Sequence, residues 1–99
     1  MLYRVAVFHS KPELVEESKR FQRQARQRMS MLNPVKHLLL QSMADPTQFA
    51  QVIRFDDEES LSKYLASDEL KSIQQDPTGA NFWADRTLPF VVDHYRCID

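Results

Sequence analysis

An arginine stands in the middle of a short apolar segment near the start of the chain, where a charge is costly to bury. Arg4 precedes Ala6 and Phe8 at the spacing of one strand face. Arginine cannot shed its proton, so a buried guanidinium needs an anionic partner or a ligand oxygen. Two interpretations stay open: a structural ion pair, with Asp93 or Glu69 as the carboxylate, and an anchor for a carbonyl or anionic oxygen of a ligand.

Three further side chains are candidates for the same ligand. Tyr64 can supply a second hydrogen-bond donor, and Trp83 can line a pocket for a planar molecule, although it can equally fill the core. His37 shares a strand face with Leu39, so it can be a buried acid–base group. We therefore take Arg4, Tyr64, Trp83 and His37 as candidate ligand-binding residues and assign no catalytic residue.

Composition excludes several classes of site. Gly79 is the single glycine, which rules out phosphate-cradling loops and the nucleophile elbow, because each needs two or more glycines. Cys97 is the single cysteine, and the three histidines have no helical pair spacing, so we expect no metal and no cofactor. The net charge of 13 − 14 = −1 and the lack of a long apolar run predict a cytoplasmic protein that binds neither nucleic acid nor membranes.

The first predicted helix carries a run of basic residues. Its members are Lys19, Arg20, Arg23, Arg26 and Arg28. On a helical wheel most of them lie opposite the apolar stripe, and Glu16 stands three and four residues before Lys19 and Arg20. We interpret the run as a solvated, salt-paired face and not as a nucleic-acid site.

The elements that must position these residues follow from periodicity and turn signals. Ser10, Pro12 and Glu13 form the pattern of a capped helix start. Asp56 and Glu59 stand at capping-box spacing, which indicates a second helix that starts near Asp57. Leu70 falls out of phase with the apolar face of that second helix. We therefore expect a break near Ser67. The predicted elements are strands at 2–9, 35–43, 48–55 and 88–95, a helix from residue 10 to about 31, a broken helix from 57, and a turn at 81–85.

This order predicts one ferredoxin-like domain spanning residues 1–99, an α+β fold with helices on one face of a four-stranded antiparallel sheet. Apolar residues nevertheless occupy both sides of the predicted strands: Tyr3 and Val5 alternate with Ala6 and Phe8, for example. A monomer would leave that second apolar face in water. We therefore expect a homodimer in which two sheets pack together.

At this point the chain resembles the dimeric α+β barrel superfamily, and the stress-responsive A/B-barrel proteins more than the antibiotic-biosynthesis monooxygenases. The resemblance rests on 3–8, 52–68, 81–83 and 89–95. It implies a homodimer with a small-molecule cavity between sheet and helices. Tyr64 matches the A/B-barrel pattern, but Arg4 and Leu70 replace two histidines of that pattern, so a proton-transfer role of those imidazoles does not carry over.

Two functions therefore remain open. The first is a small-molecule-binding dimer of the A/B-barrel type without chemistry of its own. The second is a cofactor-independent, monooxygenase- or cyclase-like enzyme acting on an aromatic or polyketide-like substrate. The missing histidines favour the first, and in both cases the expected ligand is a small aromatic molecule.

Overall fold

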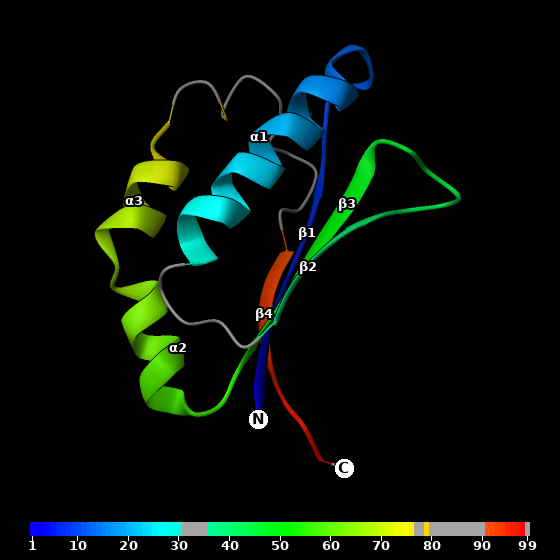
Figure 1. Ribbon diagram of the computed structural model, residues 1–99. Coiled ribbons are helices and arrows are strands. Elements are labelled where there is room, and N and C mark those ends of the chain that lie inside the picture. Colours follow the sequence, from blue (N-terminus) through cyan, green and yellow to red (C-terminus); the bar gives the residue numbers. More distant parts are fainter. Residues whose placement is uncertain (31–35, 77–78, 80–90, 99) are drawn as a thin grey trace.

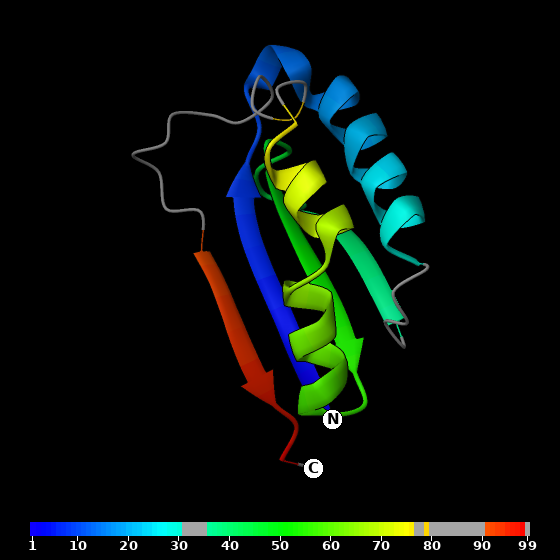
Figure 2. The same cartoon turned by 90° about the vertical axis from the view of Figure 1, so that its left-hand side faces the viewer.

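The computed structural model describes residues 1–30, 36–76, 79 and 91–98. Its elements are β1 (Leu2–His9), a 3₁₀ turn η1 (Pro12–Leu14), α1 (Val15–Met29), β2 (Lys36–Gln41), β3 (Gln48–Phe55), α2 (Glu58–Leu65), α3 (Asp68–Gln74) and β4 (Val91–Arg96). The strands form an antiparallel sheet in the order β2-β3-β1-β4. Figures 1 and 2 show the three α-helices on one face of this sheet, as the ferredoxin-like prediction requires.

Element bounds agree closely with the predicted ones where they can be compared. The second strand is shorter than 35–43, and the fourth begins at Val91, with 88–90 outside the described residues. The turn expected at 81–85 also lies outside them. Within the described ranges, no helix is long and apolar enough to cross a membrane.

The break between α2 and α3 is confirmed, and each of these helices has a side-chain cap. The Asp57 carboxylate accepts the backbone N–H of Ser60 at 2.8 Å, and the Ser67 hydroxyl accepts that of Leu70 at 3.2 Å. The cap of α2 is thus Asp57 and not Asp56, the first residue of the expected capping box. The break turns Leu70 inward, where it joins a core that includes Ile53, Phe55 and Tyr64.

The expected helix cap at Ser10 is wrong. Ser10 continues the sheet, because its N–H donates to the Thr47 carbonyl at 2.8 Å. Its hydroxyl donates to the Ser18 hydroxyl at 2.6 Å, and Gln22 Nε2 donates to the same oxygen at 3.0 Å. Strand pairing therefore places Ser10 beneath α1. Its side chain joins a buried hydrogen-bond network with Ser18 and Gln22 and does not cap a helix.

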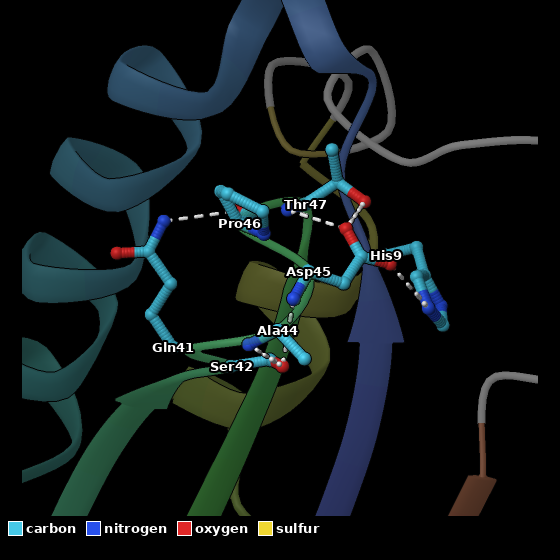
Figure 3. A network of polar contacts seen from close by, with 7 residues as sticks. All are labelled: His9, Gln41, Ser42, Ala44, Asp45, Pro46 and Thr47. Carbon is cyan, nitrogen blue, oxygen red and sulfur yellow. Dashed lines mark hydrogen bonds and ion pairs between the residues drawn. The ribbon is translucent and has the colours of Figure 1, made fainter.

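The β2–β3 hairpin is closed by its own polar side chains (Figure 3). The Ser42 hydroxyl accepts the N–H groups of Ala44 and Asp45 at 3.2 and 3.0 Å. The Asp45 carboxylate accepts the N–H and the hydroxyl of Thr47 at 3.0 and 2.6 Å, and these bonds lower the pKa of Asp45. These bonds hold the turn that joins the two strands.

The sheet face that carries no helix is largely apolar. Residues on this face share the register of Val5, which lies opposite Val52 on one side and Asp93 on the other. Leu38 and Leu40 on the same face are 38% and 46% exposed. The chain thus leaves uncovered the second apolar face that its sequence predicts.

Candidate functional site

A cavity of about 270 Å³ lies between the helix-covered face of the sheet and the helices. Three of the four candidate residues line it: Arg4 from β1, His37 from β2 and Tyr64 from α2. The remaining wall is mostly apolar, with amides interspersed. Its residues are Phe8, Phe21, Gln22, Ala25, Arg26, Met29, Gln51, Leu70, Ile73 and Gln74.

Strand register explains why Arg4 and His37 face the same space. Both residues lie opposite Ile53, one on each side of β3, so all three belong to one row across the sheet. Adjacent strands are about 4.8 Å apart, which puts the backbones of Arg4 and His37 about 10 Å from each other. The row ends with His94 on β4, which is exposed and does not line the cavity.

Arg4 is buried, and no carboxylate of the described residues pairs with it. It is 6% exposed, and within the described part of the chain its buried Nε has no hydrogen-bond partner and its guanidinium forms no ion pair. The ion pair with Asp93 is wrong, because Asp93 lies opposite Val5 and so belongs to the other sheet face. The pairing with Glu69 is absent as well, since that side chain is exposed on α3.

Tyr64 packs beside the guanidinium. Arg4 Cζ is 5.8 Å from the centre of the Tyr64 ring, which also meets Phe55 edge to face at 5.2 Å. Tyr64 is 2% exposed, and burial raises its pKa while the charge of Arg4 opposes the shift. The phenol therefore stays protonated near neutral pH and can act as a hydrogen-bond donor.

His37 is a neutral imidazole in this site. Burial lowers its pKa from 6.5 to about 4, and the charges of Arg26 and Arg4 add to the effect. Both ring nitrogens are buried and have no hydrogen-bond partner in the described part of the chain. An imidazole with two unused nitrogens can donate one hydrogen bond to a ligand and accept another.

Trp83 lies outside the described residues. His9 belongs to the opposite sheet face, where its Nε2 is 3.8 Å from Asp45 (Figure 3). No group of three potential metal-binding side chains occurs within residues 1–30, 36–76, 79 and 91–98.

Several lining residues were missed although the sequence contained a signal for them. Gln51 stands between Phe49 and Ile53 in the strand alternation, and Gln22 is adjacent to Phe21 in the apolar stripe of α1. Both positions are polar where the periodicity calls for burial. A buried amide needs a hydrogen-bond partner. A glutamine at a buried position of an apolar pattern is therefore a sequence signal for a cavity wall that includes polar groups.

Together these groups bring different chemistry to one cavity. A fixed cation, a protonated phenol and a neutral imidazole face a mostly apolar space that is close to the lower end of the roughly 300–1,000 Å³ typical of ligand pockets. Such a site can orient the oxygen of a small planar molecule and desolvate its rings.

Solved structures of other proteins share this fold. A conserved protein from Methanosarcina mazei Go1 is 21% identical with a TM-score of 0.77, over 96% of this chain and 90% of that one. A structure of an antibiotic biosynthesis monooxygenase is 17% identical with a TM-score of 0.78 over the whole of both chains. A candidate antibiotic biosynthesis monooxygenase from Deinococcus radiodurans is 11% identical with a TM-score of 0.82, over 100% and 94% of the two chains.

At these identities the likeness establishes the ferredoxin-like α+β fold. No protein-family model matches the chain, and no curated protein matches it in sequence.

Proposed function

We propose that this protein binds a small, planar, mostly apolar molecule through a carbonyl or anionic oxygen held by Arg4. The observation that carries the proposal is a guanidinium 6% exposed, at the wall of a cavity, with no carboxylate partner among the described residues. Charge buried in this way costs free energy that an ion pair would normally offset. A ligand oxygen in the cavity would supply this compensation.

The other two polar groups complement Arg4 in this role. Tyr64 is a protonated donor beside the guanidinium, and His37 is a neutral donor and acceptor on the next strand but one. The apolar walls supply the desolvated area that binds aromatic rings, worth roughly 25 cal/mol for each Å² removed from water. The ligand class that fits is an aromatic ketone, quinone or carboxylate of two or three fused rings.

We further propose that the working unit is a homodimer of the stress-responsive A/B-barrel type. The uncovered apolar face of the sheet supports this assembly, because Leu38, Leu40 and Tyr95 would lose contact with water in it. The fold shared with antibiotic biosynthesis monooxygenase structures is compatible with either barrel group.

A second function is favoured by one observation, the position of His37 in the same cavity as Arg4. An imidazole can remove a proton next to a ligand carbonyl while the guanidinium stabilises the resulting enolate, as in a cofactor-independent cyclase or oxygenase. The low pKa of His37, about 4, makes it a weak base, however. Binding without turnover therefore remains the preferred function.

The test compares two probes that differ in one oxygen, acetonaphthone and ethylnaphthalene, by isothermal titration calorimetry. We expect the ketone to bind at least tenfold more tightly, because a hydrogen bond from a charged donor contributes about 1.5–3 kcal/mol. Equal affinities would contradict the role of Arg4. Incubating bound ketones in air and analysing the products by mass spectrometry tests the enzyme: a product formed by the wild type and not by His37→Gln would establish it.

A further inference from the structure

A second hollow, of about 230 Å³, adjoins the edge strand β2. Three cations of α1, namely Lys19, Arg23 and Arg26, line it above apolar side chains that include Leu39 and Phe49. We call this hollow the basic groove. Figure 2 shows α1 running along the β2 side of the sheet, which explains why this flank of the helix faces a strand as well as solvent.

The basic groove adjoins the cavity. Gln22 and Arg26 line both hollows, so these two side chains border both spaces. Arg26 also acts electrostatically on the cavity, because its charge contributes, after burial, to the lowered pKa of His37. A ligand that extends past these two side chains would reach both spaces, with one part near Arg4 and another in the basic groove.

The charges of the basic groove are only partly compensated. The salt-paired interpretation of the basic run is confirmed for two of its members, because Lys19 pairs with Glu16 at 3.3 Å and Arg20 pairs with Glu17 at 3.7 Å. Arg23 and Arg26 form no ion pair with a described residue. No carboxylate is among the described residues that line the groove. Two guanidinium groups thus lie beside an apolar floor with no counter-charge in the described chain.

We propose that the ligand carries an oxyanion on a short tail, which Arg23 and Arg26 hold in the basic groove while the planar body fills the cavity. Guanidinium groups match carboxylate and phosphate oxygens in geometry, and the apolar floor suits the methylene groups of a tail. This inference rests on the proposed function and narrows its ligand class to an amphipathic aromatic anion. It also gives a role to a basic run that the cavity alone leaves unused.

The test uses naphthoylpropanoate, a naphthyl ketone with a carboxylate tail, and its neutral amide, naphthoylpropanamide. Acetonaphthone, which lacks the tail, reports on the cavity alone. By calorimetry near neutral pH and at low salt, we expect the acid to bind about fivefold or more tightly than the amide. At about 1 M salt, where the screening length falls to about 3 Å, the ratio of the affinities of the acid and the amide should fall toward one.

Two single substitutions on α1 localise the effect. Arg23→Gln removes a charge that lines the basic groove but not the cavity, and Arg20→Gln removes the same charge from an exposed position that lines neither. We expect Arg23→Gln to abolish most of the preference for the acid, while Arg20→Gln retains it. Affinity for acetonaphthone should be the same in both variants and in the wild type.

Each other outcome has a definite meaning. If acetonaphthone binds but the acid and the amide bind equally, the oxyanion proposal is wrong and the proposed function stands. Equal losses in Arg23→Gln and Arg20→Gln would assign the preference to overall charge and would also overturn the proposal. If none of the naphthyl probes binds, the proposed function and this inference fail together.

Discussion

Arg4 and His37 define the site at the scale of single residues. The guanidinium keeps its charge at any ordinary pH. The imidazole is neutral near pH 7, because burial and the charges of Arg26 and Arg4 lower its pKa to about 4. Between them they present a permanent cation and a neutral polar group on one cavity wall. The pattern fits a ligand with one electron-rich oxygen and few other polar atoms.

Stability should fall as pH decreases through the range in which His37 differs between the folded and unfolded chain. The folded pKa is about 4 and the unfolded value 6.5, so the unfolded chain binds more protons and the contribution of His37 is lost from pH 6.5 down to about 4. Because His37 is only partly buried, solvent screening limits the loss to about 1 kcal/mol.

Urea unfolding at several pH values measures this effect. His37→Gln should flatten the profile above about pH 4, while His94→Gln, on the exposed end of the same sheet row, should leave the wild-type slope. Hydrogen bonds lower the pKa values of Asp45 and Asp57 from 3.8, so these carboxyls act at the acidic end of the profile, where their contribution is lost as the pH falls. An unchanged slope in His37→Gln would show that His37 is not the group responsible.

At the scale of elements, alternation and phase predicted most of the fold, and the errors have identifiable causes. The strand faces followed from period two, and the break at Ser67 followed from Leu70 falling out of phase. The cap at Ser10 failed because local signals do not reveal that Thr47, far along the chain, extends the sheet pairing to this residue. The Asp93 pairing failed because strand register decides which face a residue shares.

The candidate site was predictable from the sequence only in part. Arg4, His37 and Tyr64 could be found because each is a polar residue in an apolar pattern or at a matching family position. The basic groove could not be found, because a helical wheel shows which face of α1 is polar but not that this face overhangs the edge strand β2. That arrangement depends on how the helix crosses the sheet.

Gly79 lies close to the ring of Phe21 on α1. A Cβ placed on Gly79 would stand 2.6 Å from Cζ of Phe21, and Phe21 lines the cavity. Gly79→Ala therefore forces the Phe21 ring to shift, which should cost about 1–3 kcal/mol of stability and weaken acetonaphthone binding about tenfold.

The double variant Gly79→Ala with Phe21→Leu is the control for that change. The smaller leucine makes room for the new methyl group, so the added alanine should cost less in this background than in the wild type. Thermal unfolding of the four proteins of the cycle measures the coupling. Strictly additive effects would contradict the contact.

At the scale of the whole molecule, the helices shelter one apolar sheet face and leave the other in water. Leu38, Leu40, Val91 and Tyr95 are each more than a third exposed on that side. In the proposed homodimer, a second copy would pack sheet against sheet and cover them with C₂ symmetry, which would leave the cavity and the basic groove free on the helix side. Each protomer would then carry its own candidate site.

Light scattering tests this assembly. We expect a mass twice the 11.7 kDa of one chain, and a shift to the single-chain mass in Val52→Glu, which places a charge at the centre of the uncovered face. Leu65→Glu, the same kind of change at an exposed position on α2, should leave the dimer intact. A single-chain mass for the wild type at micromolar concentration would contradict the dimer.

The most direct test of the proposed function measures Arg4→Met for ligand affinity and stability together. The proposal predicts that acetonaphthone binds about tenfold or more weakly in Arg4→Met. The free energy of unfolding should stay the same or rise, because an apolar side chain of similar length replaces a buried charge that has no carboxylate partner among the described residues. Arg96→Met, in which an exposed arginine outside the cavity is lost, should change the affinity little. Unchanged affinity together with a large loss of stability in Arg4→Met would instead identify Arg4 as a structural residue and contradict its role as the ligand anchor.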